Sequence, residues 1–466
     1  MNLINTIINT TNDILWGNVL IVLLIVLGIY FTWRTGFVQF TYLKEMFSLL
    51  GDGLGKNSKK HKGVSSFQAF CISTASRVGT GNIAGIAIAI VMGGPGSVFW
   101  MWLIALIGAA SAFIESTLAQ IYKVKDKDAY RGGPAYYMEK GLGKRWLGIL
   151  FAGLITVTFG LIFNAVQANT ITTAFSNAFH INKVVMGMMI SLVTAVVIFG
   201  GIKRIAKVTE ILVPFFAVGY ILVALVVILL NIKELPGMIA LIFQNAFGLR
   251  EMAVGGIAGT ILYGAKRGLF SNEAGMGSAP NAAATAHVSH PVKQGLIQAL
   301  GVFVDTIVIC SCTAFIILLS GDYMNSSLTG IELTQAALTS QFGVFGKYFI
   351  ALCIVLFAFS SIIGNYYYGQ SNIEFIKANK LWLMIYRISV IAMVMFGSLV
   401  EVAIVWNLAD LFMGFMAIIN LIAITLLCHI AVGCLKDYKA QKKAGIEDPI
   451  FKASSIKGLK NTTEWK

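Results

Sequence analysis

The chain has 466 residues, of which 57% are hydrophobic and only 12% are charged, and its mean hydropathy is +0.79. This composition excludes a soluble globular domain and is typical of an integral membrane protein. The formal net charge of +14 would also fit a nucleic-acid-binding protein, so the distribution of that charge along the chain has to be considered.

Apolar runs of about 20 residues, the length that crosses roughly 30 Å of hydrocarbon, recur along the chain and predict eleven transmembrane helices. The first run is no convincing signal peptide, because no Lys or Arg precedes it and Asp13 is the only formal side-chain charge before it. The second and seventh runs are long and interrupted by glycine. The predicted spans are 15–33, 64–92, 95–122, 147–178, 183–201, 208–232, 252–285, 295–320, 344–372, 381–398 and 402–434.

Lys and Arg alternate between successive loops, and short loops rich in these residues stay in the cytoplasm. The linker between the first two spans holds six of them: Arg34, Lys44, Lys56, Lys59, Lys60 and Lys62. Residues 123–146 hold seven and the tail after 435 holds eight, whereas the loops 93–94, 179–182, 321–343 and 399–401 hold none. We therefore expect a multi-pass protein of a plasma membrane, with the N-terminus outside and the C-terminus in the cytoplasm.

This topology, together with contact between the basic loops and anionic membrane lipid, accounts for most of the positive charge. A nucleic-acid partner is not needed to explain it, and no obligate protein partner is evident. The six cysteines lie in or beside apolar spans without the spacing of a zinc site, which indicates buried hydrophobic residues.

The second span contains Gly79-Thr80-Gly81-Asn82-Ile83-Ala84, which matches the dinucleotide-binding fingerprint G-x-G-x-x-G/A. That motif requires a preceding strand, an aqueous helix N-terminus and an acidic residue about 20 positions further on. Here both flanks are membrane-length apolar sequence, and Ile104 and Ala105 occupy the position of the acidic residue. The glycines therefore predict a break in a membrane helix, which is tolerated only where the backbone is buried in protein or lines a cavity.

A similar cluster, Gly275-Met276-Gly277-Ser278, interrupts the seventh span. The two clusters lie five spans apart, so they occupy corresponding positions in two halves of opposite orientation. This pattern predicts an all-α membrane protein with a five-plus-five inverted repeat, two discontinuous helices that form a substrate site near the midplane, and one extra N-terminal helix. The alternative is that the glycines only permit close packing of helices.

The two clusters divide the predicted membrane domain into two repeats. No extramembrane segment is long enough for a second domain. The predicted organisation comprises an N-terminal helix and cytoplasmic linker (1–63), a first five-helix repeat (64–232), an extracellular connector (233–251), a second repeat (252–434) and a basic cytoplasmic tail (435–466).

The first break offers groups that suit a zwitterion and a hard monovalent cation. Freed backbone N–H groups from Thr80 to Ile83, at the positive end of a half-helix dipole, suit a carboxylate. Freed carbonyl groups near Ala75 and Val78 suit a sodium ion or an ammonium group.

Four segments carry a resemblance to a known family: "SRVGTGNIAGIA", "YRGGPAYYMEKGLG", "VQANTI" and "GAKRGLFSNEAGMGSAPNAAATAHVSHPVKQG". In composition and order, over nearly the whole chain, they resemble the alanine/glycine:cation symporter family of prokaryotes. The resemblance implies a fold similar to that of the sodium-coupled bacterial leucine transporter, with one additional N-terminal helix. It implies a transporter and not an enzyme: sodium-coupled symport of a small neutral amino acid into the cell by alternating access.

The resemblance also implies roles for individual residues. Backbone and side-chain amides at the first break would hold the substrate carboxylate, while Gln167 and carbonyls near Phe270 and Ser271 would hold its amine. The implied substrate contacts are Thr80, Gly81, Asn82, Gln167, Phe270, Ser271 and Gly275. A sodium ion, the coupling ion, would be bound by oxygen atoms of Ala75, Val78, Phe357, Ser360 and Ser361.

One departure from the family concerns the size of the pocket. Many members carry Trp in the ninth span where this chain has Asn365, followed by three tyrosines. An asparagine there would leave the pocket roomier or more polar than a bulky aromatic ring would. Alanine or glycine is the expected substrate, with serine as a further candidate.

Charged residues within or at the edge of spans should pair or face water, because an unpaired charge costs at least about 2.5–3.5 kcal/mol there. They are Arg77, Glu115, Lys266, Arg267, Glu273, Asp305 and Glu401. A pair between Arg77 and either Glu273 or Asp305 would latch a gate; the alternative is that each residue is a fixed structural counter-ion. The buried carboxylates also leave open a proton-coupled symporter of the same fold.

Histidine residues provide little support for an enzyme or a resident metal. His287 and His290 have the i, i+3 spacing of a metal site on a helix, but the sequence offers no third ligand near them.

Overall fold

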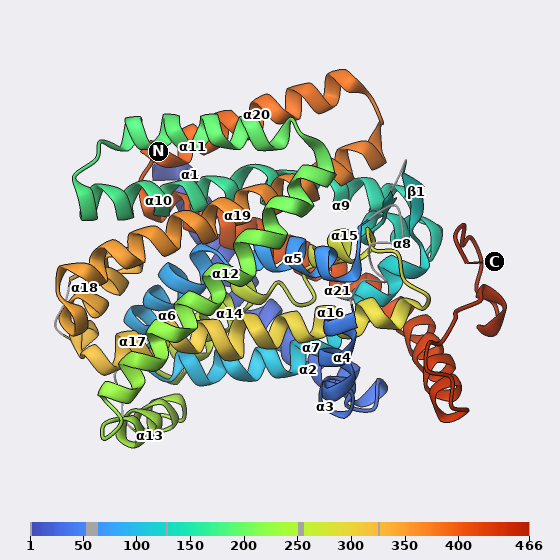
Figure 1. Cartoon of the computed structure of the whole chain (residues 1–466), viewed down its shortest axis with the longest axis horizontal. Helices are drawn as coiled ribbons and strands as arrows, with labels where there is room; N and C mark the ends of the chain where they lie inside the picture. Colours follow the sequence, from blue (N-terminus) through green and yellow to red (C-terminus); the bar gives the residue numbers. More distant parts are fainter. Residues whose placement is uncertain (1, 53–63, 127–128, 250–255, 325–326, 466) are drawn as a thin grey trace.

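The computed structural model describes residues 2–52, 64–126, 129–249, 256–324 and 327–465. In these ranges the chain is almost wholly helical, and most of the long helices run side by side along the longest axis of the molecule (Figure 1). Helices are the expected form here, because backbone polar groups in hydrocarbon must find hydrogen-bond partners within the chain.

The first interrupted helix lies near the N-terminal end of the chain and is bent by 48° at its break. It consists of α5 (Ser66–Arg77), the π-helical turn η3 (Gly81–Gly85) and α6 (Ile86–Gly93). Before it come α1 (Asn2–Ile14), η1 (Leu15–Leu20), α2 (Ile21–Arg34), α3 (Val38–Thr41) and α4 (Leu43–Asp52). After it come α7 (Ser97–Ile121), α8 (Pro134–Lys140), α9 (Arg145–Val157), η4 (Thr158–Phe163), α10 (Asn164–Phe179), α11 (Lys183–Ile198), α12 (Gly201–Leu230) and α13 (Leu235–Ala246).

The second interrupted helix is divided more widely, into α14 (Gly256–Asn272) and the short α15 (Ala279–Ala283). It is followed by α16 (Pro291–Val302), η5 (Phe303–Cys310), α17 (Ser311–Ser320), η6 (Asp322–Met324), α18 (Gly330–Phe342), α19 (Val344–Ile376), α20 (Lys380–Leu399), α21 (Val402–Lys443) and η7 (Ala453–Ser455). Both α14 and α16 pack along α7, so α7 contacts helices that precede and follow the second break.

The structure confirms that the chain has several helices able to span a membrane, but it does not confirm their predicted number. Within the described residues, eight helical segments are long and apolar enough to cross a membrane, and the bent pair α5–α6 would make a ninth. Each of the eleven predicted spans contains a helix, but α11 has only 16 residues and the seventh span is divided. The number eleven and the inverted repeat therefore stay predictions.

Several local features differ from the sequence-based expectation. The chain is not purely helical, because β1 (Val124–Asp126) and β2 (Ala129–Arg131) form a small antiparallel hairpin before α8. The predicted connector 233–251 contains α13, and α21 continues nine residues past the predicted end at 434, to Lys443. The linker residues Lys56, Lys59, Lys60 and Lys62 and the predicted boundary at 252 lie outside the described residues.

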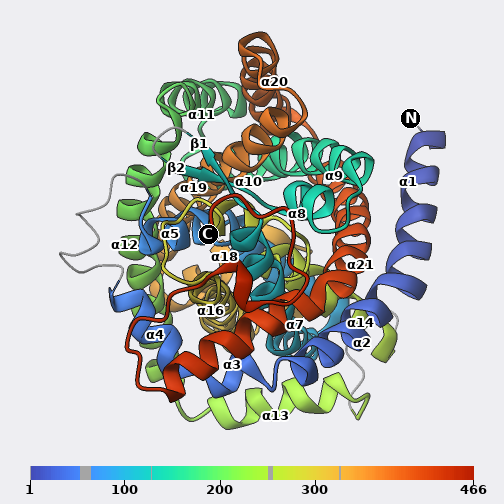
Figure 2. The same cartoon turned by 90° about the vertical axis from the view of Figure 1, so that its right-hand side faces the viewer.

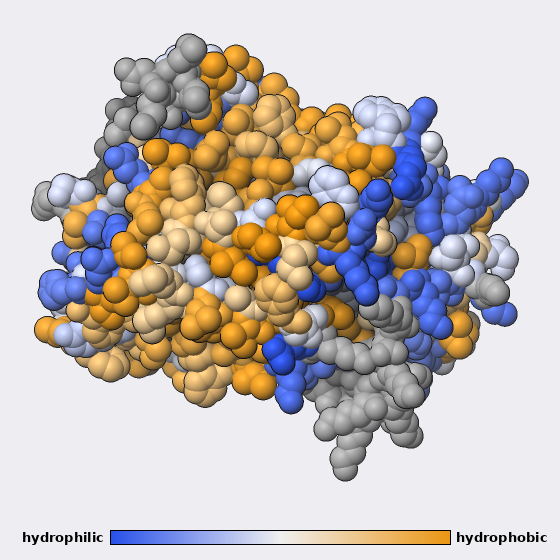
Figure 3. All heavy atoms as spheres, turned by 90° about the horizontal axis from the view of Figure 1, so that it is seen from above, coloured by the Kyte–Doolittle hydropathy of each residue, from blue (hydrophilic) through white to orange (hydrophobic). Residues whose placement is uncertain are grey.

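A broad apolar surface covers the sides of the helices, with polar residues gathered mainly at one end (Figure 3). Large side chains point outward from it, including Phe215 (73% exposed), Leu192 (67%) and Leu229 (68%). Such a surface is unfavourable in water and suits contact with lipid chains.

The basic tail after α21 folds back across one end of the molecule (Figure 2). Phe451 and Trp465 are buried there, and the Trp465 Nε1–H donates to the backbone carbonyl of Gln120 at 2.8 Å. The tail is therefore part of the packed structure.

Candidate functional site

The first break exposes backbone groups that side-chain amides satisfy. α5 ends at Arg77, and the extended Val78 separates it from the π-helical turn η3. The N–H of Gly79 donates to Asn82 Oδ1 at 3.0 Å, and the N–H of Thr80 donates to Gln167 Oε1 at 2.9 Å. The predicted residues Thr80, Asn82 and Gln167 thus lie together, although Gln167 is 87 residues further along the chain.

The five residues predicted to bind sodium also converge. Ser361 Oγ on α19 lies 2.8 Å from the carbonyl oxygen of Ala75, 3.3 Å from that of Val78 and 3.1 Å from that of Phe357. Ser360 Oγ lies 2.8 Å from the same Phe357 oxygen. Three carbonyl and two hydroxyl oxygens in one buried place are the type of ligand set that a hard cation requires.

Glycine at position 79 is required by this arrangement. A Cβ atom on Gly79 would lie 2.2 Å from Ser361 Oγ and 2.8 Å from Gln167 Oε1, which no side chain could tolerate without displacing both. The glycine of the motif therefore permits close approach of α19 and α10 to the break, beyond any role in helix flexibility.

An aromatic side chain of the second interrupted helix packs against the first interrupted helix. A Cβ atom on Gly81 would lie 2.9 Å from the Phe270 ring, so the two residues are in close contact. The Phe270 ring packs between Phe163 and Trp406, with centroid distances of 4.6 and 4.7 Å. Sequence reasoning named Phe270 but missed Trp406, which lies 136 residues further along the chain in a helix with no motif.

The second break is stabilised by a buried carboxylate. Glu273, Gly275 and Gly277 have positive φ angles of 58°, 82° and 83°, and the N–H groups of both glycines donate to Glu115 of α7, at 3.2 and 3.1 Å. Glu115 also accepts from Asn420 Nδ2 at 2.7 Å. The predicted substrate residue Gly275 thus directs its N–H to a protein carboxylate in this structure.

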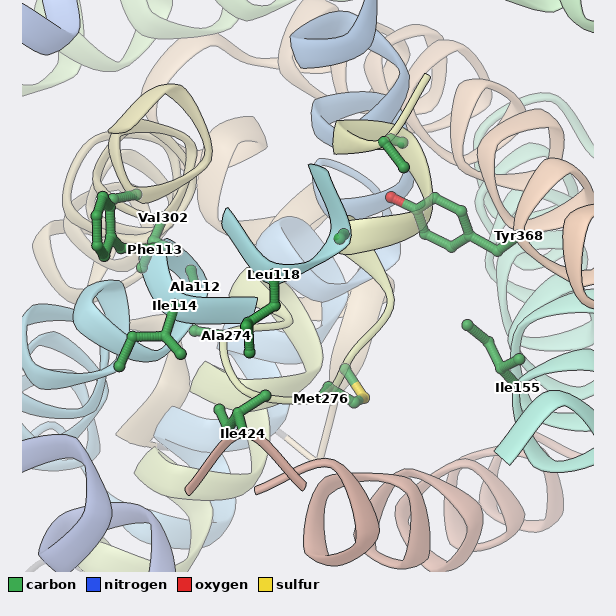
Figure 4. Close-up of a cluster of buried hydrophobic side chains, with 14 of the residues drawn as sticks. Ala112, Phe113, Ile114, Leu118, Ile155, Ala274, Met276, Val302, Tyr368 and Ile424 are labelled. Carbon is green, nitrogen blue, oxygen red and sulfur yellow. The ribbon is translucent and has the colours of Figure 1, made fainter. Parts of the chain in front are cut away.

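Buried apolar side chains surround this break. Figure 4 shows Ala274 and Met276 of the break among Leu118 of α7, Ile155 of α9 and Ile424 of α21. This packing holds the non-helical backbone inside the protein, as the sequence predicted for glycine clusters at membrane depth.

Asn365 belongs to a polar cluster that joins the two interrupted helices. Its Oδ1 lies 2.7 Å from Ser76 Oγ, which also lies 2.7 Å from Glu273 Oε1. Ser278 donates to the other oxygen of Glu273 at 2.6 Å. The Nδ2 group of Asn365 is buried and makes no hydrogen bond within the described part of the chain.

Asp305 joins two further predicted residues. Its carboxylate accepts hydrogen bonds from Asn82 Nδ2 at 2.7 Å and from Ser271 Oγ at 2.8 Å. The sequence analysis placed Asp305 among the charged residues of the spans, as one of two alternative partners for Arg77. Its position beside Asn82 and Ser271 could not be read from spacing.

The predicted latch involving Arg77 is not found. Arg77 is buried and donates to the carbonyl of Gln298 at 3.2 Å, and among the described residues it makes no ion pair with Glu273 or Asp305. Buried ion pairs occur instead at Asp410 of α21, which lies 2.6 Å from Arg267 and 3.7 Å from Lys266. His290 caps α16 and bonds Asp437, and the described residues contain no group of His, Cys, Asp and Glu able to hold a metal.

Comparison with known proteins assigns this chain to a family. The model of the sodium:alanine symporter family matches residues 1–453. The amino-acid carrier protein AlsT of Bacillus subtilis is 58% identical over 99% of this chain and 98% of its own length. The probable sodium/glutamine symporter GlnT of Bacillus subtilis is 57% identical over 98% of this chain and 95% of its own length. The sodium/alanine symporter AgcS of Methanococcus maripaludis is 38% identical over 94% of this chain and 98% of its own length.

A solved structure supports the fold alone. A mutant of the manganese transporter of Eremococcus coleocola has a TM-score of 0.54 and 14% sequence identity, and the match covers 83% of this chain and 81% of that one. Together with the apolar helices and the two interrupted helices, these findings show that the chain is a multi-pass membrane protein of the sodium:alanine symporter family.

Proposed function

We propose that this chain carries a small neutral amino acid, namely alanine, glycine or serine, into the cell together with sodium by alternating access. The observation that carries the proposal is the meeting of Ser361 Oγ with the carbonyl oxygens of Ala75 and Val78 at the first break. The family name and the printed names of the relatives support sodium and amino acids as the transported species.

In this proposal the two halves are inverted repeats in the membrane, with the N-terminus outside and the C-terminus in the cytoplasm. The substrate carboxylate would bind the N–H groups around Thr80 and Gly81 together with Asn82, displacing the amide oxygens that now satisfy them. Gln167 and the carbonyl groups near Phe270 and Ser271 would bind the substrate amine, and Gly275 and Asn365 would border the site.

Uptake of labelled alanine into proteoliposomes tests the proposal. We expect accumulation above equilibrium when a sodium gradient is imposed. Ser361→Ala should raise the sodium concentration for half-maximal uptake by about tenfold, the effect of losing about 1.4 kcal/mol of ion binding. Ser389→Ala is the matched control, because its hydroxyl bonds only a carbonyl of its own helix, that of Ile385. Uptake that never exceeds equilibrium would contradict symport.

Proton coupling is the second candidate mechanism. Asp305 is completely buried and has no basic side chain within ion-pair distance among the described residues, so binding of a proton would relieve a buried charge. Accumulation driven by a pH gradient without sodium would favour this mechanism over sodium coupling.

Glutamine is the second candidate substrate. The relative GlnT is named for glutamine, and Asn365 carries a buried amide N–H₂ group without a partner in the described part of the chain. A substrate with a side-chain amide would supply the missing acceptor.

A further inference from the structure

Asp305 accepts hydrogen bonds from both interrupted helices. Its side chain is fully buried, and its Oδ1 accepts from Asn82 Nδ2 at 2.7 Å while its Oδ2 accepts from Ser271 Oγ at 2.8 Å. Asn82 belongs to the first interrupted helix and Ser271 to the second. A single carboxylate on a third helix therefore contacts one residue from each.

The π-helical form of η5 (Phe303–Cys310) brings a second side chain to the same place. Residues five apart in an α-helix point about 140° away from each other, whereas the wider π-helical turn brings them to nearly the same side. Cys310 Sγ accordingly lies 3.3 Å from Asn82 Nδ2 and 3.1 Å from Ser271 Oγ. Asp305 and Cys310 thus contact the same two residues.

Asp305 and the backbone of Gly79 together decide how Asn82 is oriented. Asn82 presents its N–H₂ group to the Asp305 carboxyl group. The amide oxygen then faces the opposite way, where it accepts from the N–H of Gly79 at 3.0 Å. Ser271 is oriented in the same manner, because its hydroxyl hydrogen is directed to Oδ2 of Asp305.

Among the described residues, no basic side chain forms an ion pair with this carboxylate. Arg77, the buried cation of the first interrupted helix, donates to the Gln298 carbonyl, and Lys266 and Arg267 pair with Asp410. The third hydrogen bond to Asp305 comes from Thr306 Oγ1 at 2.9 Å, within its own helix. The hydrogen bonds that Asp305 makes to other helices therefore all go to the proposed substrate site.

We propose that Asp305, assisted by Cys310, is the positioning residue of the substrate site: it holds the side chains of Asn82 and Ser271, one from each interrupted helix, at the fixed separation at which they border the amino acid. This role rests on the proposed function, since it presumes that Asn82 and Ser271 contact the substrate.

The test is equilibrium binding of labelled alanine to purified Asp305→Asn protein in the presence of sodium. The amide has nearly the same shape but offers one acceptor oxygen in place of two, so either Asn82 faces another donor or Ser271 has to turn its hydroxyl hydrogen away from position 305. We expect the dissociation constant to rise about 10- to 100-fold, the usual effect of losing a hydrogen bond to a charged group. Thr306→Val is the matched control, because it removes only the donor from the same helix, and it should change the constant by no more than about threefold.

A double-mutant cycle separates positioning from a merely structural role. If Asp305 acts through Ser271, Asp305→Asn should weaken binding far less in a Ser271→Ala background than in the wild type. The proposal would be overturned if Asp305→Asn raised the dissociation constant by the same factor in both backgrounds. It would also be overturned if Asp305→Asn alone left the dissociation constant unchanged. Should Asp305→Asn not fold, Cys310→Ala takes its place in the same cycle, with a smaller expected rise.

The behaviour of the wild-type protein distinguishes a failure of the proposed function from a failure of the role of Asp305. A wild-type protein that neither binds nor transports alanine, glycine or serine contradicts the proposed function. A wild-type protein that binds alanine, combined with an uncoupled cycle, contradicts the role of Asp305 alone.

Discussion

At the scale of single residues, most polar side chains of the site bond groups on distant segments of the chain. Asn365 is only partly satisfied, because its oxygen lies beside Ser76 Oγ while its N–H₂ group makes no hydrogen bond among the described residues. A buried donor without a partner is costly, which makes this position sensitive to what fills the space beside it.

Replacing Asn365 should therefore change the choice of substrate. Asn365→Trp introduces a bulky aromatic ring, and we expect glutamine uptake to fall at least about tenfold while glycine uptake stays within about threefold, since large substrates are excluded first. Competition of unlabelled glutamine, alanine and glycine against labelled alanine measures this. Asn365→Leu separates bulk from polarity, because it keeps the size and removes the amide. An unchanged order of competition in both variants would remove Asn365 from the specificity of the site.

At the scale of elements, the two interrupted helices are stabilised differently. The break in the first is short and its freed N–H groups are satisfied by the neutral amides of Asn82 and Gln167. The break in the second is longer, and its freed N–H groups donate to the carboxylate of Glu115. Glu115 receives both glycine N–H groups and the Asn420 amide on its two oxygens, so one side chain holds the second break together.

Glu115→Gln should thus destabilise the fold. The glutamine offers one acceptor oxygen and turns a donor group toward one of the two glycine N–H groups, so we expect a loss of about 1.5–3 kcal/mol, visible as a lower thermal midpoint in detergent. Glu139→Gln makes the same chemical change in a partly exposed ion pair with Arg145, where the expected loss is below about 1 kcal/mol. Equal midpoints for the two variants would contradict this account of the second break.

At the scale of the whole molecule, the C-terminal tail connects elements that lie far apart in the sequence. Trp465 packs against Phe451 with a centroid distance of 5.4 Å, and Thr463 Oγ1 donates to the carbonyl of Lys123 just beyond α7. The backbone of Phe451 bonds that of Ser289 before α16. Figure 2 shows the tail crossing the end of the helix bundle.

Trp465→Ala should release the tail without unfolding the helices. The substitution removes a buried ring and the hydrogen bond to Gln120, and a chain terminus can detach locally when it loses such contacts. We expect limited proteolysis to cleave the tail several times faster, with a small change in the thermal midpoint. Trp33→Ala is the control, because Trp33 is 69% exposed on the outer surface of α2 and does not contact the tail. Equal cleavage rates in both variants would contradict the docking of the tail through Trp465.

The sequence by itself determined the membrane location, the positions of the helices and the two breaks. These follow from local physics: apolar runs of sufficient length must form helices in lipid, and glycine is the residue that permits positive φ angles such as those at Gly275 and Gly277. The family resemblance further identified Ala75, Val78, Phe357, Ser360 and Ser361, which the structure brings into one place. Their roles in binding sodium stay predictions, as do those of the substrate residues.

Only the tertiary structure decided which side chains meet. Asp305 contacts Asn82 across 223 residues of sequence, and Arg267 pairs with Asp410 across 143. Arg77, in contrast, makes no ion pair with either of its predicted partners among the described residues. Such pairings depend on how each helix is rotated about its axis and on where a π-helical turn such as η5 changes the side-chain register. Neither property leaves a periodic signal in an almost uniformly apolar span, because every face of the helix is buried in protein or in lipid.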